Sequence, residues 1–519
     1  MKTYIRTNFN SKIGIGHIIR STRLASEMKK KGIDCTFVLD KFCPENLVNF
    51  KKVFLYNNSK KFTSEIDDAK LFCKFIKRDK QTYVLVDDYR IGEKWQRYVS
   101  KYFKKIITFD DLEDRKLFAD VIINYNPKNI VFLKYDPSRN KKRKCNFLIS
   151  PKFNVISKHP LTKNYNFLKN KFYITFYIGG GSNQNTFYNL LNSLAKKINN
   201  YHNIKILVVI GPLSKNKNLI RKLSNKYKCV EAVSGYNNLY YIIKNTKIFI
   251  GTSGTTIFET AYLRTPTVLF KMSENQKTDI FSLEKIGHYF FLNSRDLHLT
   301  DKFIKFILLI FRNYPRFKSF IKKPKIKIDN NGAKRLVESI FFNQNKNKNI
   351  KKIIKYKLRN KYKIRPVEDK DINHYLYCRN LDINKAKSSN KKIISILDHY
   401  IWWFQTKRKS YVLIKNNIKI LYFYEEDLFS QKQKKYLLSG WFACIKNCSI
   451  KEILLALNWQ RNKKNKNIKW IAFIKKNNYF SLRLNKYIGW KNLNKKYSII
   501  KFLSKKYKIK AENFIFQER

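Results

Sequence analysis

Short apolar runs alternate with helix-forming segments along the first 340 residues or so, and this alternation constrains the fold more than any other feature of the sequence. A helix is expected from about His17 to Lys31. Apolar runs bounded by Asp, Asn or Pro lie at Tyr4–Thr7, Thr36–Leu39, Tyr83–Val86, Lys105–Phe109 and Asp120–Ile123. Repeated strand–helix alternation predicts an α/β fold with a mostly parallel sheet and helices on both faces.

A second α/β segment begins at Lys171. Its expected elements are strands at Phe172–Ile178, Ile204–Ile210, Ile248–Ile250 and Pro266–Phe270, and a helix at Ile257–Leu263. A polar, low-complexity stretch, NQNKNKNIKKIIKYK, then reads as a linker before a third unit. We therefore expect domains at residues 1–165 and 166–342, a linker at 343–357 and a third domain at 358–519.

The net charge of the chain is +72, from 109 Lys and Arg against 37 Asp and Glu. Such an excess raises a basic nucleic-acid-binding protein as one alternative. That alternative requires Lys and Arg gathered on one face with interleaved aromatic residues and salt-sensitive binding. The basic residues are instead spread along the whole chain, as solvated faces are, so we expect no nucleic-acid partner.

Eight cysteines are scattered singly, with no CxxC pair and no Cys/His ligand spacing. The sequence therefore predicts neither a disulfide framework nor a zinc site. The N-terminus lacks the apolar core of a signal peptide, and no uncharged apolar run reaches about 18 residues. We expect a cytoplasmic protein without membrane insertion.

Glycines precede the expected helices at three places. Gly14 and Gly16 stand directly before His17, with Arg20 one turn later on the same helix face. A histidine at this position can accept a proton near neutral pH. Glycine at a helix start lets a ligand approach the free backbone N–H groups, which favour anions.

Two such starts lie in the second segment. Gly180 and Gly181 follow the strand that begins at Phe172, where backbone amides could hold a phosphate. The run Gly251–Thr256 precedes the other helix, with Glu259 one turn inside it. Two glycine- and serine-rich helix starts in one domain indicate a nucleotide site.

Acidic residues follow two successive strands of the first segment. Asp87, Asp88 and Tyr89 come after one apolar run, and Asp110 and Asp111 come after the next. The carboxyl ends of parallel strands face the crevice in which open α/β sheets bind ligands. We therefore expect these acidic residues to share one crevice.

These motifs, in this order and with Glu274-Asn275-Gln276 after them, resemble the UDP-2,4-diacetamido-2,4,6-trideoxy-β-L-altropyranose hydrolases of pseudaminic acid biosynthesis. Those enzymes are relatives of the MurG-type glycosyltransferases, and the resemblance covers about residues 1–340. It implies a GT-B type pair of Rossmann-like domains with the site in the cleft between them. It also implies metal-independent, inverting hydrolysis at the anomeric carbon, without a cofactor, that yields UDP and free sugar.

The resemblance also implies residue roles. His17 would be the base that activates water. The sugar would be bound by Gly14, Gly16, Arg20, Tyr89, Asn275 and Gln276. The UDP moiety would be bound by Gly180, Gly181, Ser253, Thr255 and Glu259. The UDP-sugar is then the expected partner, together with other enzymes of the same sugar pathway. One departure is Asp88, which stands where the family often has histidine and takes no histidine's role.

The third segment resembles the GNAT acetyltransferases over about residues 361–495, through Arg379-Asn380, the Trp402–Phe404 run and Asn477–Ser481. Enzymes of that class hold the acetyl-CoA pyrophosphate on a glycine-rich loop that opens a helix. The matching stretch Ala443–Ile450 has no glycine. Lys446, Ser449 and Asn477 are the candidate acetyl-CoA contacts, and both a working acetyltransferase and a domain without this activity stay open.

A glycosyltransferase of the same fold, with a UDP-sugar donor and a sugar or lipid acceptor, is the main alternative for the first two domains. Fold alone does not separate transfer to water from transfer to another acceptor. The early GxGH and the NQ pair favour hydrolysis, whereas an apolar acceptor patch in the first domain would favour transfer.

Overall fold

The computed structural model of the chain divides into two compact units, Met1–Asn349 and Ile350–Arg519, each described here by itself. The structure describes all residues except 10–13, 44, 46, 57–60, 128–144, 157–164, 178–183, 212–213, 215, 236–237, 272–278, 322–323, 343–361, 389–391, 432–433, 463–466 and 494–497. The expected linker at 343–357 lies outside the described residues.

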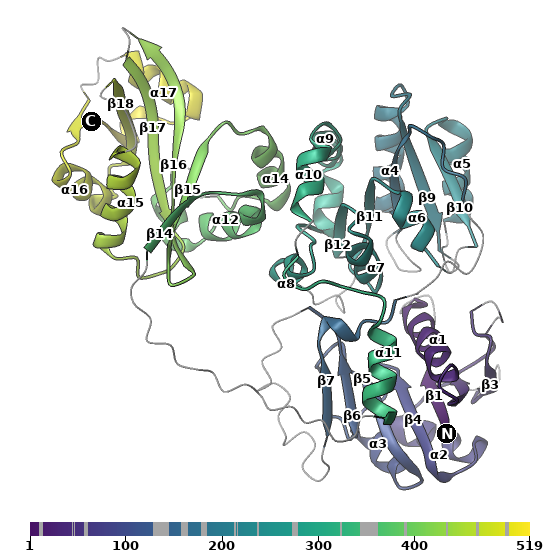
Figure 1. Cartoon of the computed structure of the whole chain (residues 1–519). Coiled ribbons are helices and arrows are strands. Elements are labelled where there is room, and N and C mark those ends of the chain that lie inside the picture. Colours follow the sequence, from purple (N-terminus) through teal and green to yellow (C-terminus); the bar gives the residue numbers. More distant parts are fainter. Residues whose placement is uncertain are drawn as a thin grey trace. The chain divides into compact units, whose positions relative to one another are not determined.

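The first unit begins with a parallel sheet in the order β3-β2-β1-β4-β5-β6-β7 (Figure 1). The strands are β1 (Lys2–Thr7), β2 (Asp34–Leu39), β3 (Lys51–Phe54), β4 (Asp79–Asp87), β5 (Phe103–Phe109), β6 (Val121–Asn124) and β7 (Asn146–Ile149). Its helices are α1 (Gly16–Lys29), α2 (Glu65–Phe75) and α3 (Glu93–Ser100). The order reverses beside β1, which creates the crevice in which such sheets bind ligands.

Both faces of this sheet are covered, as the sequence predicts. Ile5 and Leu85 belong to the cluster that includes Ile18 of α1, whereas Tyr4 and Val84 pack with Phe72 of α2. Neighbouring residues of one strand point to opposite faces, so each strand contributes to both clusters. This explains why the strands read as nearly continuous apolar runs.

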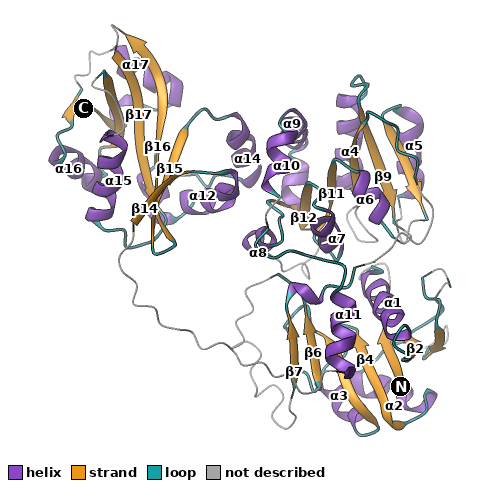
Figure 2. Ribbon diagram, viewed as in Figure 1, coloured by secondary structure: helices purple, strands orange, loops and turns teal. Residues whose placement is uncertain are grey.

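The second sheet of this unit is also parallel, in the order β10-β9-β8-β11-β12-β13. Figure 2 shows its strands β9, β11 and β12 with helices α4, α5, α6 and α7 near them. Its strands are β8 (Phe172–Tyr177), β9 (Ile204–Ile210), β10 (Val230–Ser234), β11 (Ile248–Thr252), β12 (Thr267–Lys271) and β13 (Phe290–Asn293). The helices are α4 (Gln184–Ile198), α5 (Lys217–Lys226), α6 (Tyr240–Asn245), α7 (Thr256–Leu263), α8 (Ile280–Lys285), α9 (Thr300–Arg312) and α10 (Tyr314–Phe320). The predicted pair of Rossmann-like domains is confirmed.

Helix α11 (Gly332–Val337) and the π-helical segment Glu338–Phe342 after it pack against the first sheet and its helix α1, although they follow the second sheet in the chain (Figure 1). Leu336 lies in the same apolar cluster as Ile18 of α1, and Phe341 stacks edge-on against Tyr83 of β4. A Cβ on Gly332 would lie 1.9 Å from the carbonyl oxygen of Asn154, so only glycine fits there. The chain therefore returns from the second sheet to the first.

The second unit is built on a mixed sheet in the order β14-β15-β16-β17-β18-β20-β19, in which β17 and β18 are parallel and the other neighbours are antiparallel. The strands are β14 (Tyr362–Pro366), β15 (Lys409–Lys415), β16 (Ile418–Gln431), β17 (Lys434–Ala443), β18 (Ile468–Lys475), β19 (Lys491–Asn492) and β20 (Phe514–Glu518). The helices are α12 (Ile372–Arg379), α13 (Asp382–Lys387), α14 (Ile396–Gln405), α15 (Ile450–Asn462), α16 (Tyr479–Tyr487) and α17 (Ser498–Tyr507). This α/β arrangement confirms the predicted GNAT-like fold.

Within the described part of the chain, no helix combines the length and the apolar character needed to cross a bilayer.

Candidate functional site

The starts of α1 and α7 face each other in the first unit. A Cβ built on Gly16, the first residue of α1, would lie 3.9 Å from the hydroxyl oxygen of Thr255, which precedes α7. Neither start is capped by a side-chain hydrogen bond from its N-cap residue. Two uncapped helix starts bring free N–H groups and partial positive charge to one place, which suits a diphosphate.

Two glycines shape the backbone beside these starts. Gly14 has a φ of 76°, a left-handed conformation that most other residues avoid. A Cβ on Gly251 would lie 2.7 Å from the carbonyl oxygen of Tyr177, so β11 can pass close to β8 only with glycine there. Both glycines are therefore required by the backbone itself.

His17 is fixed by a buried carboxylate. Its Nδ1 lies 2.6 Å from Oδ1 of Asp87, the last residue of β4, and His17 is 8% exposed. With Nδ1–H donating to the carboxylate, Nε2 is the nitrogen that can accept a proton. A carboxylate on one imidazole nitrogen sets the tautomer and stabilises the imidazolium that forms when the other nitrogen takes a proton.

Arg20 holds this carboxylate in its ionised form. Its guanidinium binds Asp87 through Nε at 2.7 Å and Nη2 at 2.5 Å, and Ser21 donates a further hydrogen bond at 3.0 Å. Burial by itself would raise the pKa of Asp87, but the charges of Arg20 and His17 outweigh it and hold this pKa well below its ordinary value. The partner of His17 is therefore a permanent anion.

The same guanidinium also joins the next strand. Arg20 Nη1 lies 2.6 Å from Oδ2 of Asp111 and 3.0 Å from the Tyr125 hydroxyl. Arg20 therefore connects the last residue of β4 with the segment that follows β5. The prediction that the acidic residues of these two strands share one crevice is confirmed for Asp87 and Asp111.

Tyr89 forms a wall of the site. Its ring stands edge-on to the His17 ring with centroids 4.3 Å apart, and its hydroxyl donates to Asp111 at 2.9 Å. Burial, followed by the charge of Asp111, raises the pKa of Tyr89, so the phenol keeps its proton and acts as a donor. Tyr89 thus holds the imidazole from the side.

Asp88 serves a separate network on the other face of the sheet. It pairs with Arg90 at 2.6 Å, and Arg90 reaches Asp40 at 2.9 Å. Fully buried Arg6 joins Asp40 to Asp68, each at 2.6 Å. Asp88, which stands where the resembled hydrolases often have histidine, therefore belongs to this second network and does not contact His17.

An ion pair crosses between the two Rossmann-like domains. Arg23 Nη2 on α1 lies 2.7 Å from Glu259 Oε1 on α7. Gly16 lies about two turns before Arg23 on α1, and Thr255 lies about one turn before Glu259 on α7. The two helices therefore lie side by side, and Glu259 stands next to the site rather than in the body of its own domain.

The structure brings many of the predicted site residues together and leaves others undescribed. His17, Arg20 and Tyr89 lie around the end of β4. Gly14 lies before α1, Gly16 is its first residue, and Ser253, Thr255 and Glu259 lie at and inside the start of α7. Gly180, Gly181, Asn275 and Gln276 lie outside the described residues.

Arg20 is placed differently from the sequence prediction. The resemblance assigns it to the sugar, but its side chain is 3% exposed and binds Asp87 and Asp111. We interpret it as a positioning residue. Sequence reasoning also gave no role to Arg23, Tyr125 or Asp87 as the partner of His17, because their partners lie 67 to 236 positions away in the chain.

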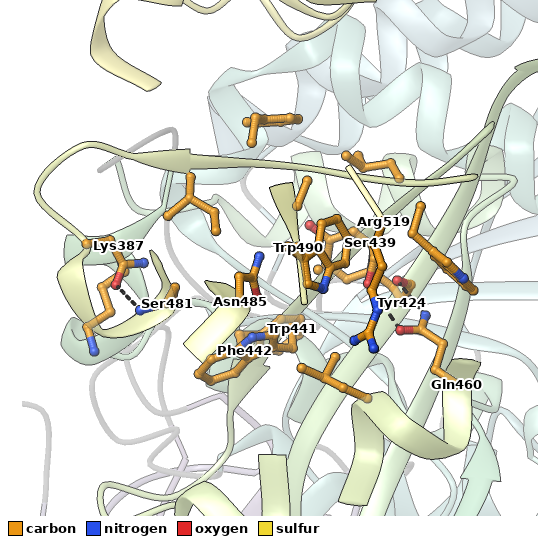
Figure 3. Close-up of a pocket in the computed structure, with 18 of the residues that line it drawn as sticks. Lys387, Tyr424, Ser439, Trp441, Phe442, Gln460, Ser481, Asn485, Trp490 and Arg519 are labelled. Atoms are coloured by element: carbon orange, nitrogen blue, oxygen red, sulfur yellow. Dashed lines mark hydrogen bonds between the residues drawn. The ribbon is translucent and has the colours of Figure 1, made fainter. Parts of the chain in front are cut away.

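A cavity of about 250 Å³ lies in the second unit, where β17 and β18 separate (Figure 3). The two strands pair only from Lys435 with Ile468 to Leu438 with Ile471, and both continue beyond that point. Residues of β17 after Leu438 and of β18 after Ile471 line the cavity. A Cβ on Gly440 would collide with the Tyr424 ring, so glycine at this position allows the ring to pack against the β17 backbone.

Basic side chains predominate in the lining of the cavity, and one of them, Arg408, pairs with Glu426 at 2.9 Å. The basic side chains that line it are Arg379, Lys387, Arg408, Arg461 and Arg519, and no Asp or Glu is among the described lining residues. Burial and then the nearby charge of Arg461 lower the pKa of Arg519. This arrangement favours an anionic ligand.

The start of α15, where a CoA pyrophosphate is expected in GNAT enzymes, is occupied by a side chain of the protein. Glu452 Oε2 accepts from the Ser449 N–H at 3.0 Å, and the Ser449 hydroxyl accepts from the Glu452 N–H at 3.3 Å. This reciprocal pair is a capping box. The capping box places the Glu452 carboxylate at the helix start, where a phosphate would need to bind. Glu452 is held there, since it is 4% exposed and also pairs with Lys415.

The three candidate acetyl-CoA residues do not line the cavity. Lys446, Ser449 and Asn477 are exposed, and the cavity is lined by Asn478 instead of Asn477. Asn478 caps α16 through a bond from the Ser481 N–H at 3.4 Å. The assignment of Lys446, Ser449 and Asn477 to acetyl-CoA stays a prediction.

Comparisons with known proteins bear on both units. Residues 175–336, from β8 to α11, match the sequence model of the family described as Glycosyltransferase family 28 C-terminal domain. An uncharacterized protein of Methanocaldococcus jannaschii is 25% identical over 289 residues, which are 53% of this chain and 57% of that protein. The chain thus spans little more than half the length of this curated relative.

Solved structures that are similar to part of the chain include two from Staphylococcus aureus. The S. aureus MnaA–UDP co-structure covers 65% of this chain and 95% of its own, with a TM-score of 0.45 and 11% identity. An N-acetyltransferase from Staphylococcus aureus Mu50 covers 31% of this chain and 98% of its own, with a TM-score of 0.23 and 15% identity.

Proposed function

We propose that residues 1–342 hydrolyse a UDP-linked diacetamido-trideoxy sugar, UDP-2,4-diacetamido-2,4,6-trideoxy-β-L-altropyranose, to UDP and the free sugar. The observation that carries this proposal is the hydrogen bond of 2.6 Å between His17 and Asp87, beside the facing starts of α1 and α7. The family match over residues 175–336 supports a nucleotide-sugar substrate.

The residues of the site account for each part of such a reaction. His17 Nε2 takes a proton from water, and the water oxygen bonds to the anomeric carbon as the carbon–oxygen bond to UDP breaks. UDP leaves as an anion between the N–H groups at the starts of α1 and α7. Asp87 balances the positive charge that His17 acquires, and Arg20 keeps Asp87 in place.

Release of UDP from this sugar nucleotide by the purified full chain tests the proposal. Without any acceptor, wild-type protein is expected to release UDP, and His17→Asn is expected to slow turnover by about 100-fold or more, because a general base is lost. His202→Asn, an exposed histidine of the same unit, is the matched control and should behave as wild type. Turnover of His17→Asn near the wild-type rate would overturn the assignment.

Glycosyl transfer is the second candidate for this unit, favoured by the family description of residues 175–336. The same active-site residues would then activate the hydroxyl group of an acceptor instead of water. UDP release that depends on an added sugar or lipid acceptor would establish transfer in place of hydrolysis.

For the second unit we propose an anion-binding role at the cavity between β17 and β18, with acetyl-CoA as the first ligand to test. The cationic lining favours such a ligand, but the carboxylate of Glu452 at the start of α15 opposes a pyrophosphate there. Calorimetry on the full chain is therefore expected to give an acetyl-CoA dissociation constant weaker than about 0.1 mM. Low-micromolar affinity would instead make the protein bifunctional.

A further inference from the structure

Three side chains capable of binding a metal meet in the second unit, and none of them lines the cavity between β17 and β18. The ligand atoms of His374, Cys378 and Cys444 all lie within 4.8 Å of one another. The closest recorded approach is 3.4 Å, between Cys378 Sγ and His374 Nδ1. Both cysteines are buried and His374 is partly exposed.

The fold brings these residues together from two elements. His374 and Cys378 are four positions apart on α12, so they lie on the same helix face one turn apart. Cys444 directly follows β17, and its N–H donates to the Ile420 carbonyl at 2.8 Å, which fixes the backbone at this point. The sequence predicts no zinc site because the third ligand stands 66 positions after the second and forms no local Cys/His spacing.

We propose that His374, Cys378 and Cys444 bind a thiophilic divalent cation, with Zn²⁺ as the physiological candidate. Two thiolates and an imidazole are ligands that select zinc over Mg²⁺ or Ca²⁺, which require oxygen. Zinc–sulfur and zinc–nitrogen bonds of about 2.3 and 2.1 Å place tetrahedral ligands roughly 3.5 to 3.8 Å apart. The observed separations need only small side-chain adjustments to reach that geometry.

The binding step is balanced in protons and charge. Zn²⁺ replaces the thiol protons of Cys378 and Cys444, which pass to the solvent, and His374 supplies a nitrogen lone pair. The complex of one zinc ion with two thiolates and one imidazole is then neutral. Water fills the fourth position, reached from the side on which His374 is exposed. The ion would tie α12 to the end of β17.

Cobalt titration of the reduced, metal-free full chain tests the proposal. Co²⁺ is expected to bind once per chain and to produce thiolate-to-cobalt charge-transfer absorption with the visible bands of tetrahedral cobalt, and Zn²⁺ is expected to abolish both. Cys378→Ser and Cys444→Ser should each weaken binding by at least about tenfold and reduce the charge-transfer band. Cys229→Ser, a buried cysteine of the other unit, is the control and should titrate as wild type.

His374→Asn guards against misfolding of the cysteine variants, because His374 is only partly buried. It should keep the thiolate band while shifting the visible bands and lowering affinity. A band of equal strength in wild type, Cys378→Ser and Cys444→Ser would overturn the proposal. The absence of any thiolate band in reduced wild-type protein would also overturn it. The same holds if Cys378 and Cys444 are isolated as a disulfide and take up no metal after reduction.

Discussion

The hydrogen bond between His17 and Asp87 joins residues that are 70 positions apart, and it leaves Nε2 of His17 as the nitrogen that accepts a proton. Asp87→Asn is expected to reduce turnover by at least about 100-fold, because an amide neither fixes the imidazole tautomer nor balances its charge. The same change should destabilise the fold by about 3–5 kcal/mol, since buried Arg20 loses a charged partner. Urea unfolding and UDP release measure the two effects, and wild-type turnover in Asp87→Asn would refute the dyad.

Glu259 is expected to contribute to nucleotide binding rather than to the chemical step. Glu259→Ala should weaken UDP binding by about tenfold or more, because a hydrogen bond to a charged group contributes about 1.5–3 kcal/mol. Calorimetry with UDP checks this, with Glu338→Ala in the same unit as the control. Unchanged UDP affinity would show that Glu259 acts only as the ion-pair partner of Arg23.

For single residues, the sequence predicts which side chains belong to the site better than it predicts which side chains they contact. The GxGH motif and the acidic strand ends point to His17, Asp87 and Asp111 because strand ends have a fixed place in a parallel sheet. The double engagement of Arg20 depends on where β4 and β5 lie relative to α1, and the pattern of apolar residues does not encode it. Sequence reasoning therefore assigns Arg20 to the substrate, whereas the structure gives it to two carboxylates.

Among the elements, α7 depends on a buried histidine from outside the helix. His288 Nε2–H donates to the Ile257 carbonyl at 2.8 Å, and burial lowers the pKa of His288 to about 4. Because the unfolded chain binds a proton with a pKa near 6.5, stability is full above about pH 6.5 and falls as the pH drops toward 4.

His288→Gln should remove about 3 kcal/mol of this pH dependence between pH 6.5 and 4, because the pKa of His288 falls from near 6.5 in the unfolded chain to about 4 in the folded protein. Urea unfolding of both proteins across this range measures the difference. His298→Gln, an exposed histidine, should leave the pH dependence of wild type unchanged. A slope that is equal in His288→Gln and wild type would contradict the assignment.

The strands of the two parallel sheets were predictable because their apolar runs are nearly continuous. Ile204–Ile210 is found with the predicted bounds, and the other expected strands agree within a few residues. The edge strands β3, β7, β10 and β13 were not predicted. The first three carry short patterns with polar residues, as edge strands often do, and β13 is only four residues long. The packing of α11 against the first sheet could not be predicted either, because the sequence of a six-residue helix does not indicate which domain it packs against.

For the whole molecule, the division at Asn349 predicts that the first unit works without the second. A fragment of residues 1–349 should fold and release UDP at a rate close to that of the full chain. A fragment of residues 1–331 should lose cooperative unfolding, because it lacks Leu336, Val337 and Phe341, whose burial contributes about 1.5–3 kcal/mol each. Thermal unfolding and UDP release measure both, and an inactive but folded 1–349 fragment would mean that the second unit is needed for the reaction.

The central claim is that water attacks the anomeric carbon of a UDP-sugar at the site of His17 and Asp87. The most direct measurement is mass spectrometry of both products after reaction in ¹⁸O-labelled water without an acceptor. We predict that the label enters the free sugar during turnover, beyond the exchange seen with unlabelled sugar alone, and that UDP carries none. Label in UDP, or no UDP formed until an acceptor is added, would contradict hydrolysis at the anomeric carbon.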